Sequence, residues 1–517
     1  MADLDKALKI FAREGEEKTA QDQAKKLGLP YVNLVGYPFT PQVLTVIPRE
    51  QAEKFKTMAF YQLNRKVKVA SPVAENPMVV NFLRELASAI NQEFYLYKCS
   101  ESSFRYAFAQ LQFVREAPMT LDKLVVPQEY VTSRLSGAQG LQSIANKILQ
   151  TSTTEIMEII FAGAIKVDAS DIHIEPEEND ARLRYRIDGV LQDVAKLPKE
   201  TAKVLTNRIK YIAKLKLDLS KRPQDGRFEV DVADQNIDVR LSTMPGAWGE
   251  VIVMRLLNPT GAKINLAELG FRADALAKIE EAISKPHGAI FNTGPTGSGK
   301  TTTLYAILQK LNKPEVKIIT LEDPIEYRIE GIDQSQISPE KGFDFANGLK
   351  HALRQDPDII MIGEIRDKET AATALQAALT GHLVLTTLHT NSAPSSIPRL
   401  LDMGVDAFLL SGSINLIIAQ RLVRKLCPTC RGEKQINSAP CVACNGTGYK
   451  GRVALVETMQ ITPRIEKLIE KKGTILEFEK AAREDGMITM FEDGLKKVKE
   501  GITAEEEVKR VTSADIG

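Results

Sequence analysis

The middle of the chain alternates between apolar and polar residues, a period of two that predicts β-strands with one buried face. Residues 181–187 (ARLRYRI) put leucine, tyrosine and isoleucine on one face and three arginines on the other, and residues 236–243 alternate in the same way. Asp188-Gly189 predicts a hairpin turn, and a second Asp-Gly pair at residues 225–226 carries the same signal. The three-arginine face is interpreted either as a solvated strand face or as a binding surface.

Residues 250–257 (EVIVMRLL) are apolar almost throughout, with Arg255 inside the run. A buried and unpaired guanidinium is costly, so we expect Arg255 to reach an anion or a carboxylate at a domain edge. Arg240 belongs to the polar face of the run at 236–243. A structural ion pair is the alternative interpretation for both arginines.

The patterns also predict the domain organisation. Towards the C-terminus, helical stretches alternate with short apolar strands, which predicts a mostly parallel sheet with helices on both faces. The predicted division is a small α/β module at 1–115, a linker with proline and glycine at 116–140, a second domain at 141–262 and a nucleotide-binding domain at 263–517.

The segment GPTGSGKT has the spacing of a P-loop and lies between an apolar stretch and a helical one. In such a loop the glycines let backbone N–H groups surround a phosphate, and the helix start adds positive potential. Lys300 would supply a charge to the β- and γ-phosphates, and Thr301 a hydroxyl to Mg²⁺. The predicted nucleotide-binding residues are Gly294, Pro295, Thr296, Gly297, Ser298, Gly299, Lys300, Thr301 and Thr302.

An acidic cluster follows the apolar strand predicted at 318–321. It consists of Glu322, Asp323 and Glu326. Ligands of open α/β sheets bind at the carboxyl ends of the strands, where carboxylates can hold a metal or activate a water. The alternative is an acidic turn at the N-terminus of a helix.

A second apolar strand, at 359–362, is followed by Gly363 and Glu364. An apolar strand that ends in a carboxylate is the Walker B arrangement, and here glycine takes the place often held by aspartate. We therefore expect Glu364 to act, through metal-bound water. Arg354, just before this strand, either meets phosphate charge or lies on a helix surface.

A third predicted strand, at 383–388, is bracketed by His382 and His389. A histidine at the end of such a strand could sense the γ-phosphate. The alternative interpretation is that both histidines are structural.

Four of the five cysteines form two C-x₂-C pairs, Cys427 with Cys430 and Cys441 with Cys444. This spacing predicts a tetrahedral zinc site in an insert at 427–444, and a structural one, because four protein ligands leave no open position. A pair of redox disulfides is the alternative. Cys99 is expected to be a core residue.

Composition adds limits to this picture. A net charge of +1 over 517 residues gives no global attraction to nucleic acid. The apolar runs fall short of the ~20 residues that span a bilayer, and the charged N-terminus has no signal-peptide core. We expect a cytoplasmic protein whose membrane role is peripheral.

In their order, these motifs resemble the ATPases of type II secretion systems and type IV pilus assembly. The resemblance covers residues 141–517, including the blocks SDIHIEP, RPQDGR, LEDPIEY, RQDPDIIMIGEIRD and TGHLVLTTLHT. It implies an α/β fold, with a RecA-like P-loop NTPase domain preceded by a small α/β (PAS-like) domain and an N-terminal α/β module that docks a partner.

The resemblance also implies roles for single residues. Glu326 would be the catalytic glutamate and Glu364 the Walker B acid. Arg240, Arg255 and Arg354 match positions that contact phosphates, whereas Lys350 stands where many members have arginine. The tetracysteine is typical of assembly motors and is missing from the related retraction motors.

The function so implied is a homo-hexameric motor at the inner face of the cytoplasmic membrane. It would couple MgATP hydrolysis, through an inner-membrane platform protein, to the assembly of type IV pilus filaments, with ATP, Mg²⁺ and a structural Zn²⁺ and with no specific nucleic acid. The alternatives are pseudopilus assembly in type II secretion, a DNA-uptake or DNA-translocation ATPase, and a nucleotide-dependent scaffold that no longer hydrolyses.

Overall fold

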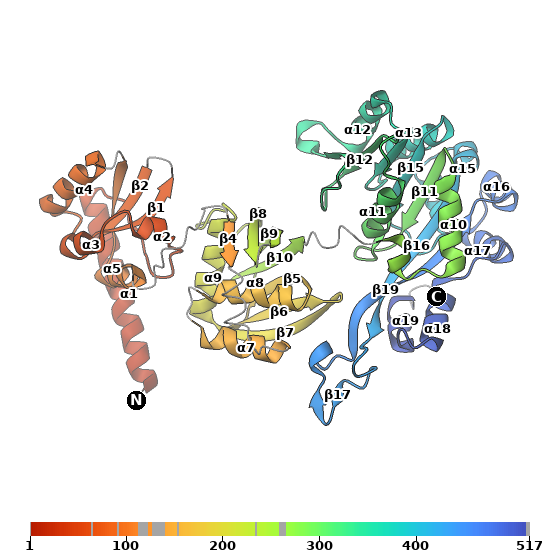
Figure 1. Ribbon diagram of the computed structural model, residues 1–517. Coiled ribbons are helices and arrows are strands. Elements are labelled where there is room, and N and C mark those ends of the chain that lie inside the picture. Colours follow the sequence, from red (N-terminus) through yellow and green to blue (C-terminus); the bar gives the residue numbers. More distant parts are fainter. Residues whose placement is uncertain are drawn as a thin grey trace. The chain divides into compact units, whose positions relative to one another are not determined.

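The chain divides into two compact units, residues 1–257 and 258–517. The computed structural model describes residues 2–63, 66–89, 92–111, 123–126, 140–151, 155–232, 235–257 and 265–512. In these ranges the first unit holds a three-stranded and a seven-stranded sheet, and the second holds another seven-stranded sheet and a small hairpin (Figure 1). Among the helices of these ranges, none has the length and apolar character that a membrane crossing requires.

The first sheet belongs to an α/β module, as predicted for the N-terminal residues. Strand β1 pairs antiparallel with β2, and β2 pairs parallel with β3. Valines of β2 and Cys99 are buried in its core, which confirms the expectation for this cysteine. The elements are α1 (Ala2–Leu27), α2 (Pro41–Leu44), α3 (Arg49–Phe55), β1 (Met58–Leu63), β2 (Lys66–Ser71), α4 (Pro77–Ala89), β3 (Glu93–Lys98) and α5 (Glu101–Gln110).

The second sheet has the order β4-β8-β9-β10-β5-β6-β7 and is antiparallel except for the pair β4 and β8. Strand β4 lies within the segment predicted as a linker, so four residues of that segment belong to the sheet. Residues 116–122 and 127–139 of the same segment lie outside the described ranges. The elements are β4 (Lys123–Val126), α7 (Leu141–Gln150), α8 (Ile156–Lys166), β5 (Ala169–Pro176), β6 (Asp180–Ile187), β7 (Val190–Pro198), α9 (Lys199–Ile212), β8 (Gln224–Val232), β9 (Gln235–Pro245) and β10 (Glu250–Leu257).

The alternation read from the sequence is confirmed in this sheet. The apolar residues of β6 are buried, and Asp188-Gly189 forms the turn to β7 with positive φ at both residues. The second Asp-Gly pair, at 225–226, is not a turn but part of β8, which corrects the prediction. The side chain of Gln224 bonds the backbone of Lys216 and Leu219, so the preceding loop ends before Asp225.

The sheet of the second unit has the order β13-β12-β14-β15-β11-β16-β19. All its pairs are parallel except β16 with β19, which confirms the predicted mostly parallel sheet. Its strands are β11 (Gly288–Thr293), β12 (Ile318–Glu322), β13 (Asp333–Gln336), β14 (Ile359–Ile362), β15 (Leu383–Leu388), β16 (Ile414–Leu426) and β19 (Tyr449–Gln460).

Helices cover both faces of this sheet because its strands are apolar on both sides (Figure 1). Ile290 of β11 packs with α10 (Ala273–Ser284) and α11 (Lys300–Leu311). Its neighbour Phe291 packs in the core of the opposite face. That face is covered by α12 (Phe345–Ala352), α13 (Lys368–Leu379), α14 (Ser396–Asp402), α15 (Ala407–Ser413), α16 (Pro463–Glu470), α17 (Ile475–Glu484), α18 (Met490–Lys499) and α19 (Glu505–Thr512).

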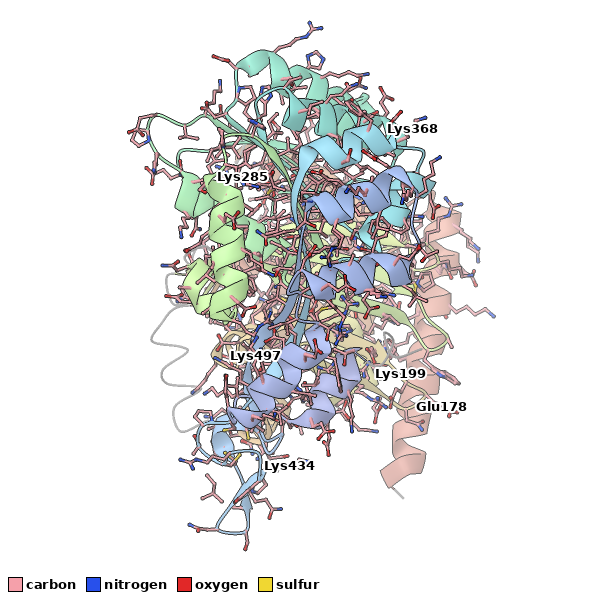
Figure 2. All side chains as sticks on the ribbon, turned by 90° about the vertical axis from the view of Figure 1, so that its right-hand side faces the viewer. Glu178, Lys199, Lys285, Lys368, Lys434 and Lys497 are labelled. Atoms are coloured by element: carbon pink, nitrogen blue, oxygen red, sulfur yellow. The ribbon has the colours of Figure 1, made fainter. Side chains whose placement is uncertain are left out.

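A buried ion pair within α18 binds the backbone of β19. Lys497, labelled in Figure 2, donates to Asp493 at 2.9 Å and to the carbonyl of Ala454 at 2.5 Å. Asp493 is fully buried and also accepts the amide of Val456 at 2.8 Å. These bonds join the C-terminal helices to the edge strand of the sheet.

Candidate functional site: strand ends around a P-loop

The P-loop connects β11 to α11, as predicted. Gly294 has φ 149°, and a Cβ at this position would lie 2.5 Å from the carbonyl oxygen of Gln420 and 2.7 Å from Ser298 Oγ. Only glycine fits this approach. Ser298 Oγ is buried and finds no hydrogen-bond partner in the described part of the chain. A tight loop with an unused buried hydroxyl and the start of a helix fits a phosphate group.

Lys300 lies across the mouth of this loop. Its Nζ donates to the carbonyl of Gly294 at 2.7 Å and to that of Pro295 at 3.1 Å. Burial lowers the pKa of Lys300 to about 8, while the charge of Glu364 acts in the opposite direction. Thr301, the next residue and the predicted Mg²⁺ ligand, is exposed on the first turn of α11.

Strand β14 delivers Glu364 to the same edge of the sheet. Gly363 is held from both sides, because its amide donates to Leu321 at 2.8 Å and its carbonyl accepts Thr387 Oγ1 at 2.6 Å. A Cβ at residue 363 would lie 3.2 Å from the carbonyl oxygen of Leu321. Glycine avoids this close contact, and Glu364 is the acid that directly follows the strand.

His389 meets Glu364 at this edge. Its Nε2 lies 3.3 Å from Glu364 Oε2, and Arg366 contacts the same carboxylate. Strands β14, β15 and β11 are neighbours and parallel, so their carboxyl ends bring Glu364, His389 and Lys300 together. His382, at the other end of β15, places Nδ1 3.1 Å from the carbonyl oxygen of Ala377, the structural alternative.

The acidic cluster after β12 separates into two environments. Glu322 is buried and accepts hydrogen bonds from Tyr305 and Thr320, and burial raises its pKa. It is therefore not free to hold a metal, which corrects the expectation for the cluster. Glu326 is partly exposed in the following turn, and its amide donates to Tyr305 Oη at 3.4 Å.

Two further predicted positions lie on the surface near α12. Arg354 is exposed in η5 (Leu353–Gln355), the short helical turn after α12, in agreement with the surface alternative. Lys350 of α12 forms an exposed ion pair with Glu369 at 2.5 Å. Neither position is tied to the P-loop by a bond of its own side chain in the described structure.

The first unit holds the predicted Arg240 and Arg255 on one exposed sheet face. Directly opposed residues of five adjacent strands form a row: Arg227 of β8, Arg240 of β9, Arg255 of β10, Asp171 of β5 and Arg186 of β6. The first four of these residues line a cavity of about 550 Å³. Like charges directly opposite one another are unfavourable, so the row fits a multivalent anion.

Arg255 differs from the prediction in its burial. Its side chain is 57% exposed, and its Nε lies 3.0 Å from Asp171 Oδ1. The expected carboxylate partner is confirmed, but the expected burial is wrong, because the pleat of β10 turns this residue to the open face. Asp171 is itself buried and also contacts Arg186 at 3.2 Å.

Several residues around these sites were not predicted from the sequence. Arg227 was not singled out, although a second arginine-bearing strand next to Arg240 was a signal for it. Arg421 of β16 is buried beside the P-loop, donating to the carbonyl of Asn391 at 3.0 Å. Its neighbour Gln420 accepts from Thr303 Oγ1 at 2.8 Å. No sequence pattern pointed to these two, since they reach the loop only through the parallel pairing of β11 and β16.

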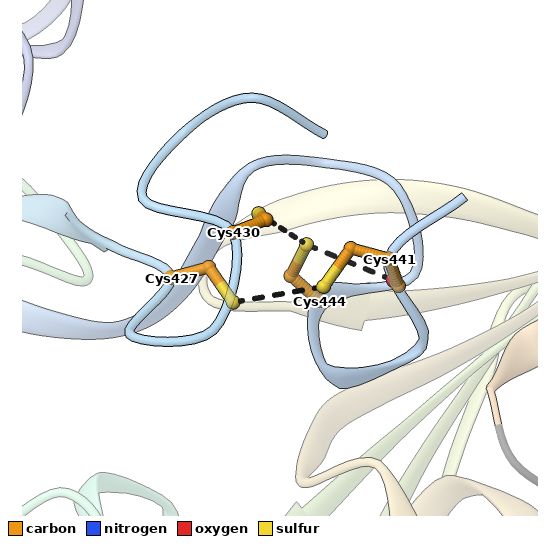
Figure 3. Close-up of side chains that lie close together, drawn as sticks. All are labelled: Cys427, Cys430, Cys441 and Cys444. Carbon is orange, nitrogen blue, oxygen red and sulfur yellow. Dashed lines mark hydrogen bonds between the residues drawn. The ribbon is translucent and has the colours of Figure 1, made fainter. Parts of the chain in front are cut away.

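The four clustered cysteines are all buried and point toward one another (Figure 3). Their sulfur atoms lie within 4.8 Å of each other, with 4.0 Å between Cys427 and Cys441 and 3.7 Å between Cys430 and Cys444. Thiolates about 2.3 Å from a tetrahedral zinc ion lie roughly 3.8 Å apart. All four are free thiols, so the disulfide alternative is not what the structure contains.

Similarity to known proteins shows the family to which the chain belongs. Residues 149–510 match the family described as Type II/IV secretion system protein. The Myxococcus xanthus "Type IV pilus assembly ATPase PilB" is 37% identical over 97% of this chain and 92% of its own length. The Vibrio cholerae "Type II secretion system ATPase E" is 37% identical over 92% of this chain and 98% of its own.

The fold agrees with these relatives. The Legionella pneumophila ATPase DotB superposes with a TM-score of 0.54 at 26% identity, covering 69% of this chain and 95% of that one. Its match supports a RecA-like ATPase domain. The chain therefore belongs to the type II/IV secretion system ATPase family and is an ATP hydrolase.

Proposed function

We propose that the chain is a homo-hexameric motor that couples MgATP hydrolysis to the assembly of type IV pilus filaments. The observation that carries the hydrolytic part is the convergence of Lys300, Glu364 and His389 at the ends of three neighbouring parallel strands. The similarity to the PilB ATPase along nearly the whole chain supports the pilus assignment. The motor would act on an inner-membrane platform protein at the inner face of the cytoplasmic membrane.

In this proposal each residue of the site has a distinct task. The P-loop amides and Lys300 would bind the β- and γ-phosphates. Thr301, and Glu364 through metal-bound water, would hold Mg²⁺, which neutralises phosphate charge. Glu326 orients and deprotonates the attacking water. His389, in contact with Glu364, reports whether the γ-phosphate is present.

Arginines would supply the remaining positive charge. Arg240 and Arg255 contact the nucleotide phosphates, and Arg354 provides a further contact. Charge of this kind acts on the equatorial oxygens of the transferred phosphoryl group. The cavity lined by Arg240 and Arg255 supports the first two assignments.

The tetracysteine would hold one structural zinc ion. The buried, inward-facing thiols and their spacing support this proposal. With four protein ligands the metal has no open position for chemistry, and its contribution would be to the folding of the insert.

The second candidate is pseudopilus assembly in a type II secretion system. It is favoured by relatives with that name, including the Xanthomonas campestris "Type II secretion system protein E", 44% identical over 73% of this chain and 70% of its own length. Capture of the full-length protein's membrane partner, followed by identification of the pilin-like subunits that accompany it, separates the two candidates. Hydrolysis stimulated by DNA would favour a DNA-translocating motor instead.

Glu326→Gln tests the hydrolytic mechanism. We expect this variant to lose most ATPase activity, on the order of 10²-fold or more, because the amide cannot accept the proton of the attacking water. Steady-state phosphate release measures turnover, and binding of a fluorescent ATP analogue should remain. Glu330→Gln, an exposed position of the same segment outside the acidic cluster, is the matched control. Unchanged turnover in Glu326→Gln contradicts the assignment.

A further inference from the structure

We propose that Tyr305 and Glu322 form a positioning pair that holds Glu326 in place relative to the P-loop helix. The inference deepens the proposed function, since it rests on Glu326 being the catalytic glutamate. In the described structure, the hydrogen bonds of these two side chains do not include the P-loop residues 294–301. Both would act on the reaction through the turn that carries Glu326.

Glu322 is the anchor of the pair. It is the last residue of β12 and is only 2% exposed. Its Oε2 accepts the hydroxyl of Tyr305, and its Oε1 accepts Thr320 Oγ1 at 2.6 Å and Gln334 Nε2 at 3.1 Å. A buried carboxylate with this many donors is fixed in one orientation.

Tyr305 connects this anchor to the phosphate-binding loop. It lies on α11, five residues after Lys300, and its side chain is fully buried. Its hydroxyl donates to Glu322 and accepts the amide of Glu326 at 3.4 Å. One hydroxyl group therefore bridges the helix that begins at the P-loop and the backbone of the proposed catalytic residue.

Gln334 closes the network on the far side of the turn. Its Nε2 donates to the carbonyl of Tyr327 at 3.1 Å, and its Oε1 accepts the amide of Ile329 at 2.7 Å. The ring of Tyr327 packs edge-on against that of Tyr305, with 4.6 Å between centroids. The turn is thus fastened at Glu326, Tyr327 and Ile329 to a single buried cluster.

The hydrogen bonds of this cluster would affect catalysis because they position the turn that carries Glu326. The turn at 323–331 contains no helix or strand, so its position depends on bonds made by side chains of neighbouring elements. A general base displaced by about 1 Å can cost on the order of 10²-fold in rate. The P-loop amides and Lys300, by contrast, bind nucleotide without help from this cluster.

Tyr305→Phe in the full-length protein tests the inference. The substitution keeps the ring and its packing on Tyr327 but removes the hydroxyl. We expect kcat to fall roughly 10- to 100-fold while KM for ATP changes by less than about twofold. Tyr185→Phe is the matched control, because Tyr185 is also fully buried and its hydroxyl donates to the carbonyl of Ile160 at 2.7 Å in the other unit.

A second comparison guards against loss of fold. Glu322→Gln keeps an oxygen that can accept the Tyr305 hydroxyl. Its kcat should therefore be higher than that of Glu322→Ala, when both are measured at a temperature at which both variants are folded. If Tyr305→Phe lowers the melting temperature as Tyr185→Phe does but leaves kcat unchanged, Tyr305 is only structural and the inference is wrong. A fully active Glu326→Gln protein would instead overturn the proposed mechanism itself.

Discussion

The side chain of Lys300 is partly buried, and this burial disfavours its charged form. Burial lowers its pKa to about 8, so the ammonium form predominates at neutral pH by a limited margin. Two backbone carbonyls bind this ammonium group across the loop mouth. Only the charged form attracts phosphate oxygens, which makes nucleotide binding sensitive to pH just above neutrality.

We therefore expect ATP affinity to fall as pH rises through about 8. A lysine with this pKa is mostly charged at pH 7 and mostly neutral at pH 9, so Kd should weaken about tenfold between these values. Calorimetric titration with a non-hydrolysable ATP analogue measures this change. In Lys300→Arg the guanidinium stays charged, so the pH dependence should disappear from that variant. A flat pH profile in the natural protein contradicts the prediction.

The positions of site residues were predictable where spacing along the chain alone sets them. The P-loop residues, Glu364 and His389 follow directly from their strands, so the sequence located them. The burial and hydrogen bonds of Glu322 were not predictable, because they depend on Tyr305 of another element. The burial of Arg255 was wrongly predicted from an apolar run, since the pleat of the strand decides which side faces out.

Among the elements, β16 and β19 stand out as the longest strands of the second unit. They pair from Leu416 with Gln460 to Leu426 with Tyr449, and the cysteine insert joins them beyond that point. The small hairpin of β17 (Gln435–Ile436) and β18 (Ala439–Pro440) lies within this insert. Its few hydrogen bonds and exposed strands give it little stability of its own, so the cysteines must hold it together.

Metal removal should therefore unfold the insert and spare the sheet. We expect about one zinc ion per chain in purified protein, and faster amide exchange in residues 427–448 after chelation, with β11 unchanged. Elemental analysis and hydrogen exchange measure the two effects. Cys441→Ser should reproduce the loss, whereas Cys99→Ser should keep its zinc. A zinc content near zero in the natural protein contradicts the Cys₄ site.

Element types were predictable from periodicity, and element boundaries were less so. The strands at 318–321, 359–362 and 383–388 were located within a residue or two, because buried parallel strands are short apolar runs. Strand β4 escaped notice, since its four residues form a strand only by pairing with β8, about 100 positions later. The turn predicted at Asp225-Gly226 was wrong for the same reason, because pairing of β8 with β9 outweighed the local turn signal.

At the scale of the whole molecule, the two units carry different parts of the proposed chemistry. The second unit holds the P-loop and the acidic strand ends, and the first holds the arginine row. The domain division at 258–264 lies outside the described residues, so the predicted boundary near residue 262 stays a prediction. The proposed function requires that the first unit affects hydrolysis in the second.

Arginine substitutions in the first unit test this requirement. We expect Arg240→Ala and Arg255→Ala each to lower ATPase activity, by on the order of 10³-fold if the arginine contacts the transition state. Arg182→Ala is the matched control, since Arg182 lies on β6 of the same sheet, outside the arginine row, and pairs with Glu177. Phosphate release by the full-length variants is the measurement. Normal activity in both variants would make these arginines structural only.

The arginine row also affects the electrostatic energy of the sheet that carries it. Arg227, Arg240 and Arg255 face one another across hydrogen-bonded strands, so their positive charges repel one another, and the Asp171 carboxylate beside Arg255 offsets part of this repulsion. In the proposed function, bound nucleotide phosphates would offset this repulsion, and their departure would restore it. Under that proposal, release of the γ-phosphate would change the net repulsion between these strands, so the chemical step would act directly on the sheet.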